Sequence, residues 1–266
     1  MDTTLTKVCI IGAGNVATHL AYALNKCTNI IQIYSHTLSN ARLLSESIGK
    51  PDIATDNISS ITCDADIYIV SIKDDCIADV IAHTPNCGIW AHTSGSTSIS
   101  IFEGFKTNYG VFYPLQTFSK YTSVNMHNVP FFIEGNNDDT YNLLANLAQL
   151  ISDTVIQADS NRRKLLHLSA VFACNFVNYM WTLAQDILQT DNLDISYLMP
   201  LLQETLNKIS TTSPHEAQTG PARRGDIQII QSHLSELSGE KREIYELISS
   251  MILNRYNTLK QKPQQL

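Results

Sequence analysis

The sequence contains six cysteines among its 266 residues but no Cys-x-x-Cys pair. Closely spaced cysteines hold zinc in intracellular proteins and build the disulfide framework of small secreted ones. Here the cysteines are widely spread, and Cys9 and Cys174 lie within apolar runs, where a free thiol behaves as a small hydrophobic side chain. We therefore expect a reduced, cytoplasmic protein without a metal site or a disulfide framework.

Positive charge is also scarce. Lys and Arg number 18 against 25 Asp and Glu, which gives a formal net charge of −7. The densest basic spots are residues 162–164 and the pair Arg223-Arg224. A chain with this balance is not expected to bind nucleic acid or an anionic membrane surface. The N-terminal residues are too polar for a secretory signal peptide, so none is expected.

One long stretch, from Leu165 to Gln185, has no Asp, Glu, Lys or Arg. A helix that spans a membrane needs about 20 apolar residues. This stretch contains His167, Asn175 and Asn178, which are unfavourable in lipid, whereas the central helix of a helical bundle tolerates them. We expect the bundle helix and no membrane span.

Apolar runs alternate with helical patterns over residues 1–158. Strands are expected at 7–12, 30–34, 66–72, 88–92, 110–113, 129–134 and 154–157, and helices at 16–27, 39–49, 75–83 and 139–152. This alternation indicates an α/β, doubly wound, mostly parallel sheet that helices cover on both faces. Residues 159–266 show only helical patterns, at 159–189, 194–210, 225–237 and 240–260, and predict an all-α C-terminal domain. Asp159 or Ser160 would cap the first of these helices.

The strongest local signal is Gly12-Ala13-Gly14-Asn15-Val16-Ala17, which matches Gly-x-Gly-x-x-Gly/Ala between the first predicted strand and helix. Gly12 permits the tight turn, Gly14 lets the backbone approach a pyrophosphate, and Ala17 lets the helix pack on the strand. The N–H groups at the start of the helix carry a partial positive charge. A dinucleotide site is therefore predicted at Gly12, Ala13, Gly14, Asn15 and Val16. A glycine-rich turn without a nucleotide is the alternative.

The end of the second strand bears on the choice of nucleotide. An acidic residue there would bind the ribose 2′-hydroxyl of NAD. The sequence instead has Ser35, His36 and Thr37, with Arg42 further on. Hydroxyl groups, a histidine and an arginine suit a 2′-phosphate better, so NADP (NADPH) is predicted over NAD. The alternatives are a solvated turn for His36 and an exposed helix position for Arg42.

Further loops follow the next predicted strands and would lie at the same edge of the sheet, where open α/β sheets bind ligands. They bring Ser71, Ile72 and Lys73 toward the cofactor, and His92 and Ser94 toward the cofactor or substrate.

Two of these loops contain residue types that also occur in hydrolytic active sites, a pair of aspartates and a serine. Asp74 and Asp75 are interpreted as capping and charging the next helix, and not as a catalytic pair. Ser94 lacks the Gly-x-Ser-x-Gly context of a nucleophile elbow, so we interpret it as a hydrogen-bonding group for a ligand. A serine-rich loop that binds its own backbone is the alternative. Tyr113, at the end of the next predicted strand, and Gln116, in the loop after it, could also face the cleft.

A polar stripe is predicted on the long helix, where Lys164, His167, Val171, Asn175 and Asn178 follow i, i+3/i+4 spacing. Polar side chains on an apolar helix need polar partners or water, which a cleft between the two domains would supply. His167 could exchange a proton near neutral pH, although a structural role is the alternative.

The stretch "TGPARRGD" contains Arg223 and Arg224 between helix-breaking residues. Two guanidinium groups on such a loop could bind a carboxylate or a phosphate, or could pair with acidic surface residues. Asp226 is a plausible N-cap of the next helix.

These motifs together resemble a family that joins a Rossmann-like NADP-binding domain to a helical C-terminal domain of unknown function and is provisionally assigned to the oxidoreductases. The resemblance involves residues 12–17, 92–96, 113–118, 167–175 and 220–226. More distantly, the chain is similar to pyrroline-5-carboxylate reductase and to the 6-phosphogluconate and β-hydroxyacid dehydrogenases. This resemblance implies an active site between the domains and a homodimer through the helical domain. Two departures are that many relatives have arginine where His36 stands, and that Leu168 replaces the asparagine of a Lys-x-x-x-Asn pair after Lys164.

The function predicted from the sequence is an NADP-dependent oxidoreductase that acts on a small carbonyl, imine or hydroxy compound in an interdomain cleft. His167 or His92 would exchange the proton, and Ser94, Asn175 and Arg224 would hold the substrate. A non-catalytic dinucleotide-binding sensor or scaffold is the alternative, because this fold serves both.

Overall fold

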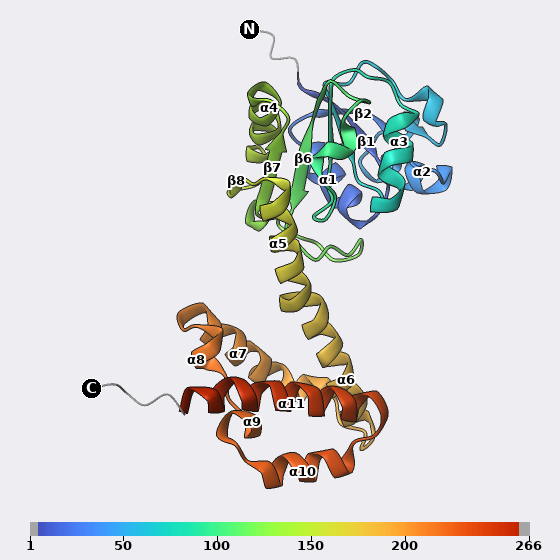
Figure 1. The fold of residues 1–266 in the computed structure, drawn as a ribbon. Helices are drawn as coiled ribbons and strands as arrows, with labels where there is room; N and C mark the ends of the chain where they lie inside the picture. The colour runs from blue at the N-terminus through green and yellow to red at the C-terminus, as the bar shows by residue number, and fades with distance from the viewer. Residues whose placement is uncertain (1–4, 261–266) are drawn as a thin grey trace, which may run out of the picture. The chain divides into compact units, whose positions relative to one another are not determined.

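The computed structural model describes the backbone of residues 5–260 and the side chains of residues 5–256. The chain divides into two compact units, Met1–Asn175 and Phe176–Leu266 (Figure 1). The sequence-based boundary after Ala158 marks the change from mixed to all-helical structure. Helix α5 (Ser160–Ala170) nevertheless belongs to the first unit, because Leu166 on it packs against the core of the sheet.

The first unit is built on an eight-stranded sheet with the order β3-β2-β1-β4-β5-β6-β7-β8. All neighbouring strands are parallel except β6 and β7, which are antiparallel. The predicted mostly parallel sheet is therefore confirmed. The strands are β1 (Lys7–Ile11), β2 (Asn29–Tyr34), β3 (Ala54–Thr55), β4 (Ile67–Val70), β5 (Ile89–His92), β6 (Asn108–Pro114), β7 (Phe131–Gly135) and β8 (Val155–Gln157).

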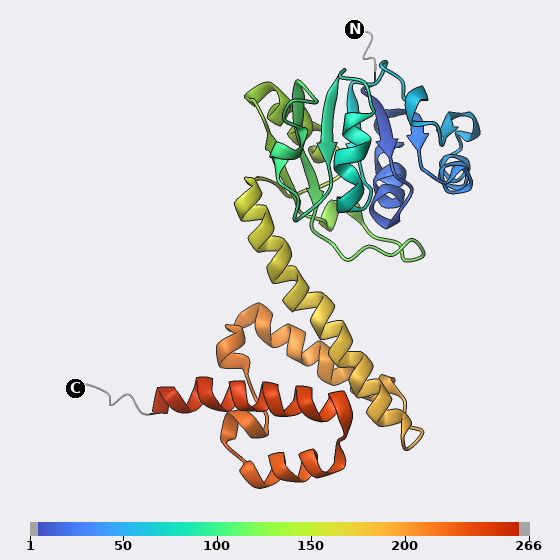
Figure 2. The ribbon, with the colours of Figure 1, turned by 45° about the vertical axis from the view of Figure 1, so that its right-hand side comes forward.

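Helices cover both faces of this sheet, as the buried apolar strands predict. Successive side chains of a strand point to opposite faces. Val8 and Ile10 of β1 pack in the core that holds α1 (Asn15–Leu24), α2 (Leu38–Ser47) and α4 (Asp138–Gln149). Cys9 and Ile11 pack in a second core with α3 (Ile77–Ala82), which Figure 2 shows in teal in front of the strands. Short 3-10 turns occur at Pro51–Ile53, Ile58–Ser60, Asp74–Cys76, Ile99–Phe102, Met126–Asn128 and Ile195–Leu198.

The long helix predicted from residue 159 to 189 is present but has three parts. Its parts are α5, a π-helical segment (Val171–Phe176) and α6 (Val177–Gln189). Asp159 caps it as predicted, since its carboxylate accepts the N–H of Arg162 at 2.8 Å. The π-helical turn is wider than an α-helical turn, so residues before and after it do not continue one α-helical stripe. The predicted stripe from Lys164 to Asn178 is therefore interrupted.

The second unit is helical throughout its described residues. After α6 it contains α7 (Met199–Thr211), α8 (Pro214–Ala217), α9 (Pro221–Arg224), α10 (Ile227–Glu236) and α11 (Gly239–Lys260). Its buried hydrophobic side chains are few, namely Leu183, Ala222, Ile230, Leu234 and Tyr256, and α7 buries none. Across residues 5–260, no helix is long and apolar enough to cross a bilayer.

Candidate functional site

Five parallel strands end at one edge of the sheet and present the predicted cofactor loops together. The strand order reverses between β1 and β4, and open α/β sheets bind ligands at such a switch point, beyond the carboxyl ends of the strands. The loops after β1, β2, β4, β5 and β6 begin at Gly12, Ser35, Ser71, Thr93 and Leu115. The predicted cofactor residues of the first unit therefore lie along this edge.

Gly12 lies where three of these segments converge. Its φ is +122°, and its N–H donates to the carbonyl of Tyr34 at 2.8 Å. A Cβ at this position would lie 2.0 Å from the carbonyl oxygen of Ser71, so only glycine fits without a shift of the backbone. Glycine is therefore required at position 12 for a second reason besides the predicted tight turn, namely the close approach of the loop after β4.

Gly14 differs from Gly12 because the space around it is open. A Cβ on Gly14 would meet no atom within 4 Å, and its φ of −81° is allowed for any residue. Helix α1 begins with no side-chain cap and no acidic residue in its first turn. The first N–H groups of a helix lack partners inside the helix and bind anions well. Ala13 is buried and Val16 half-buried, so the turn exposes mainly backbone, as the predicted phosphate site requires.

The loop after β6 folds against α1. Asn15 Nδ2 donates to the carbonyl of Phe118 at 3.1 Å, and His19 Nε2 lies 2.9 Å from the carbonyl of Ser119. The His19 ring also packs on Phe118 with centroids 4.9 Å apart. His19 was not predicted from the sequence, although its place on the predicted helix four residues after Asn15 could have indicated it. These contacts place the loop after β6 beside the phosphate-binding turn.

The segment after β2 contains the residues on which the NADP prediction rests. Ser35 is buried, its N–H donates to Thr55, and its hydroxyl accepts the N–H of Thr37 at 3.3 Å. His36 and Arg42 are exposed, and within the described part of the chain neither side chain forms a hydrogen bond or ion pair. Helix α2 has no acidic residue in its first turn.

The segment after β4 is held by neighbouring strands. Ser71 N–H donates to Ile11 at 2.7 Å, and the Ser71 hydroxyl accepts from Thr93 at 3.2 Å. Ile72 is half-buried and Lys73 is exposed. Asp74 and Asp75 lie in the first turn of the 3-10 segment that leads into α3, so they place negative charge there as expected. The expected cap is wrong, because Cys76 occupies the N-cap of α3 and no side chain caps it. Asp74 instead accepts the Ser94 hydroxyl.

The Ser94 hydroxyl is engaged inside its own loop. It donates to Asp74 Oδ2 at 2.7 Å and accepts the N–H groups of Ser96 and Thr97 at 3.1 and 2.9 Å. The residue is only 9% exposed. This is the geometry of the alternative, a serine-rich loop that binds its own backbone, and it argues against contact of this hydroxyl with a ligand.

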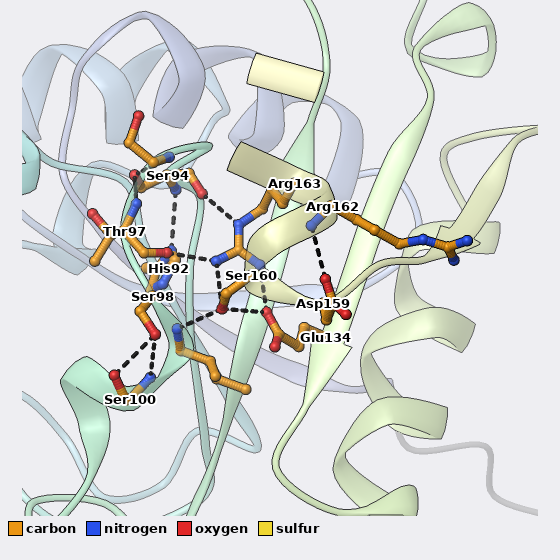
Figure 3. Close-up of polar contacts among 12 residues, drawn as sticks. His92, Ser94, Thr97, Ser98, Ser100, Glu134, Asp159, Ser160, Arg162 and Arg163 are labelled. Atoms are coloured by element: carbon orange, nitrogen blue, oxygen red, sulfur yellow. Dashed lines mark hydrogen bonds and ion pairs between the residues drawn. The ribbon is translucent and has the colours of Figure 1, made fainter. Parts of the chain in front are cut away.

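Arg163 joins that loop to α5 and β7 (Figure 3). Its Nε donates to the Ser94 carbonyl at 3.1 Å, while its terminal nitrogens donate to the Thr97 carbonyl and pair with Glu134. Ser160 completes the cluster by donating to Glu134 at 2.9 Å. The Arg163 side chain is 1% exposed. The sequence indicated only a cluster of basic residues at this point, and the buried role of Arg163 was not predicted. Its spacing of four residues from His167 could have indicated that both side chains lie on the same side of the helix.

His92 is buried beneath the same loop. Its Nδ1 accepts the N–H of Ser94 at 3.2 Å, and its ring stacks on Phe102. Burial, together with the positive charge of Arg163, lowers the pKa of His92 to about 3. A ring with 0% exposure that stays neutral near pH 7 is poorly placed to exchange a proton with a ligand, which argues against the role predicted for His92.

His167 lies against the end of β6. Its Nδ1 is 3.0 Å from the hydroxyl of Tyr113, and the ring is half-buried. Gly95 packs on the same side of the imidazole, because a Cβ there would lie 2.6 Å from Nδ1. Burial raises the pKa of Tyr113 to about 12, although the charge of Arg163 opposes the shift. The structure thus assembles a Tyr–His pair from a strand, a loop and a helix at the ligand-binding edge.

The remaining predicted substrate residues lie elsewhere. Asn175 is exposed in the π-helical segment. Arg224 belongs to the second unit, where it pairs with Asp226 at 2.8 Å, which is the alternative considered from the sequence. Asp226 occupies the N-cap of α10, but its side chain caps no N–H. Arg223 stacks on Tyr256, and both arginines line an open pocket of about 500 Å³ with residues 218–220.

Comparison with known proteins identifies two regions. Residues 1–116 match a Rossmann-like domain, and residues 129–252 match DUF2520, a domain of unknown function. No curated protein matched the chain.

Several solved structures are similar over nearly the whole chain. One from Bacteroides fragilis, provisionally described as an NADP oxidoreductase, is 38% identical, with 94% of this chain and 99% of that chain covered and a TM-score of 0.87. A Thermotoga maritima protein is 21% identical, with 94% and 99% covered and a TM-score of 0.76. The 1-pyrroline-5-carboxylate reductase of Streptococcus pyogenes is 12% identical, with 96% and 100% covered and a TM-score of 0.66. The last two show the fold alone. The chain, in which a Rossmann-like domain precedes a DUF2520 domain, therefore belongs to the same family as the Bacteroides fragilis protein.

Proposed function

We propose that the protein is an NADP-dependent oxidoreductase that acts on a small carbonyl, imine or hydroxy compound. The observation that carries this proposal is the uncapped N-terminus of α1 beside the open Gly14, at the switch point of the sheet. The description of the Bacteroides fragilis relative as an NADP oxidoreductase supports the cofactor. The fold shared with a reductase of a cyclic imine supports the reaction class.

The residues at the edge of the sheet fit a dinucleotide. The N–H groups of residues 14–16 would bind the pyrophosphate, and the backbone of residues 71–73 would border the nicotinamide half. Ser35, His36 and Thr37, with Arg42, would receive the 2′-phosphate, since no carboxylate in the first turn of α2 repels it. When bound, the cofactor supplies or accepts the hydride, and the protein orients it and manages the proton.

His167 is the proposed proton-exchanging group. It is a half-buried histidine at the ligand-binding edge, whereas His92 is enclosed and neutral. We do not assign Ser94 a contact with substrate, because its hydroxyl already makes three hydrogen bonds within the loop. Asn175 and Arg224 remain proposed substrate-binding residues.

We also propose that the protein acts as a homodimer through the helical unit, as the family resemblance implies. Exposed apolar side chains on α7 support this, notably Met199, Leu201, Leu206 and Ile209, which are 44–62% exposed. Met199, Leu206 and Ile209 share one face of α7 by i+3 and i+7 spacing, and contiguous exposed apolar surface marks association sites.

The test begins with separate titrations of the purified full-length protein with NADPH and NADH, followed by nicotinamide fluorescence. Tighter binding of NADPH is expected, and binding of neither would contradict the proposal. Aldehydes, keto acids and cyclic imines are then screened for consumption of NADPH. For a substrate that is turned over, His167→Gln should lower kcat by about 10²–10⁴-fold with an unchanged Kd for NADPH. Tight NADPH binding without turnover of any substrate would favour the sensor.

A further inference from the structure

We propose that Tyr113 and His167 form a proton relay that serves the interconversion of a carbonyl and a hydroxyl group, with Tyr113 as the positioning residue. This inference rests on the proposed oxidoreductase function and narrows its substrate class. Three observations lead to it: the direction of the hydrogen bond, the packing of Gly95, and the accessibility of the second ring nitrogen.

The Tyr113–His167 hydrogen bond has one direction that satisfies both groups. Tyr113 is 7% exposed, and its hydroxyl has no partner among residues 5–256 other than His167 Nδ1, at 3.0 Å. If Nδ1 carried the proton and donated it, the hydrogen of this mostly buried phenol would have no acceptor among residues 5–256, which is unfavourable. If the phenol donates, both groups are satisfied. The raised pKa of Tyr113 agrees with a phenol that keeps its proton.

This direction fixes the tautomer of His167. A neutral imidazole carries one proton, and a ring whose Nδ1 accepts a hydrogen bond must carry that proton on Nε2. The neutral side chain therefore presents a donor, Nε2–H, and not an acceptor.

Packing leaves that donor available to a ligand. Gly95 covers the Nδ1 side of the ring, with a position for Cβ only 2.6–2.8 Å from the Nδ1, Cγ and Cβ atoms of His167. Arg163, one helical turn earlier, binds the carbonyls of Ser94 and Thr97 and so holds this loop in place. His167 Nε2 has no hydrogen bond within the described residues, and it is not among their buried unpartnered atoms. Of the two ring nitrogens of His167, Nε2 is therefore the accessible one.

In the direction of reduction, the relay passes two protons, one from His167 to the substrate and one from Tyr113 to His167. Hydride addition to a carbonyl carbon leaves the electron pair of the C=O bond on oxygen. The oxygen forms an O–H bond with the Nε2 proton, and Nδ1 takes the phenolic proton of Tyr113. The imidazole ends neutral, and the charge ends on the phenolate near the Arg163 guanidinium. Water then protonates Nε2, and Nδ1 returns its proton to the phenolate, which restores the starting pair. In oxidation each proton moves in reverse.

The chemistry of the pair favours a carbonyl over an iminium ion. An alkoxide is a much stronger base than a phenolate, so the relay runs downhill toward the alcohol. An iminium ion becomes a neutral amine on hydride addition and needs no proton. An Nε2–H donor also suits a carbonyl oxygen, whereas it opposes the N–H of a protonated imine.

The first test reads the tautomer without any substrate. The full-length protein is labelled with ¹⁵N-histidine, and the His167 signals are assigned by their absence in His167→Gln. We expect the proton on Nε2 in the wild type and a mixture of tautomers in Tyr113→Phe. Tyr109→Phe, on the same strand, is the matched control and should leave the His167 signals unchanged. A proton on Nδ1 in the wild type would overturn the relay, whether or not the protein proves to be an oxidoreductase.

The second test uses NADPH turnover. Tyr113→Phe should lower kcat for an aldehyde or ketone by about 10²-fold or more, and adding His167→Gln should lower it little further, because the two groups act as one unit. Reduction of a preformed N-alkyl iminium ion should change less than threefold in Tyr113→Phe. Equal losses for both substrates, or a wild type that reduces only the iminium, would overturn the substrate class. Unchanged NADPH binding in every variant separates this result from a failure of the cofactor site.

Discussion

Arg163 Nε donates to the main-chain carbonyl of Ser94 at 3.1 Å, which joins the helix that carries His167 to the loop that covers its ring. The same guanidinium pairs with Glu134 on β7. A buried cation with this many partners determines where α5 lies on the sheet, and therefore where His167 lies at the ligand-binding edge.

Replacement of Arg163 by Met should destabilise the protein strongly. The change leaves the Glu134 carboxylate, 15% exposed, without its cation, and two loop carbonyls without donors. Breaking a buried pair from one side typically costs about 3–5 kcal/mol. Urea denaturation measures the free energy of unfolding. Arg162→Met is the matched control, because that neighbouring side chain is exposed, and its effect should stay within about 0.5 kcal/mol. Similar losses in the two variants would mean that the buried cluster does not hold α5.

The two glycines of the phosphate-binding turn should respond differently to alanine. Gly12→Ala places a Cβ 2.0 Å from the Ser71 carbonyl at a φ of +122°, so the free energy of unfolding should fall by at least about 1–3 kcal/mol. Gly14→Ala meets no atom within 4 Å, and as a change at the N-cap of α1 it should lower the free energy of unfolding by less than about 1 kcal/mol. It should nevertheless weaken NADPH binding at least about tenfold, because the Cβ blocks the approach of the pyrophosphate. Thermal melts and fluorescence titration measure the two effects. Unaltered NADPH affinity in Gly14→Ala would remove the turn from the site.

His36→Asp should shift cofactor preference toward NADH. The exposed His36 follows directly after the buried Ser35 at the end of β2, where a carboxylate would bind a ribose hydroxyl and repel a 2′-phosphate. The ratio of the Kd values for NADPH and NADH should change by about tenfold or more, which corresponds to about 1.4 kcal/mol. Ser47→Asp, at the exposed far end of α2, adds the same charge and should leave the ratio unchanged. A constant ratio in His36→Asp would mean that this segment does not contact the ribose.

The main fold was predictable because periodicity and turn geometry are local properties of the chain. The buried apolar runs of β1 and β4, the turn at Gly12 and the cap at Asp159 follow from neighbouring residues alone. Strand β3 was missed because two residues carry no periodic signal. The π-helical segment was not predicted, because an uncharged apolar run has no sequence pattern that distinguishes an α-helix from a π-helix.

The site was less predictable because the use of a polar side chain depends on distant partners. His92 is the last residue of β5 and Ser94 lies two residues beyond it, where ligand-binding residues are expected. The Ser94 hydroxyl nevertheless binds Asp74, and the His92 ring is buried near Arg163. Nothing local to Tyr113 indicated that His167, 54 residues later, would meet its hydroxyl. The sequence therefore predicted which edge of the sheet carries the site. It did not show which polar residues at this edge hold the loops in place and which are free to contact a ligand.

His92 should make the protein sensitive to acid. In the unfolded chain a histidine binds a proton near pH 6.5, whereas in the folded chain the pKa of His92 is about 3. The unfolded state therefore binds more protons between these values, and the free energy of unfolding falls as the pH falls below about 6.5, by up to about 1.4 kcal/mol per pH unit.

His92→Asn removes this proton linkage while its amide oxygen can still accept the Ser94 N–H. Its unfolding free energy should fall less steeply than that of the wild type between about pH 6 and pH 4. His36→Gln, at an exposed histidine, should keep the wild-type slope. If His92→Asn keeps it as well, the His92 ring is already charged in the folded protein.

Helix α7 offers the most direct test of the proposed dimer. It buries no residue, and Leu206 and Ile209, one turn apart, are 58% and 44% exposed. A second copy that covers them would remove this apolar surface from water, at about 25 cal/mol per Å². The wild type should elute with twice the chain mass of 29.6 kDa when size exclusion is coupled to light scattering. Leu206→Glu/Ile209→Glu would bury two carboxylates at the interface and should give a monomer. The control, Leu143→Glu/Leu150→Glu, alters two leucines of the first unit that are 52% and 51% exposed, and it should remain dimeric. A monomeric wild type, or two variants that dissociate alike, would contradict association through α7.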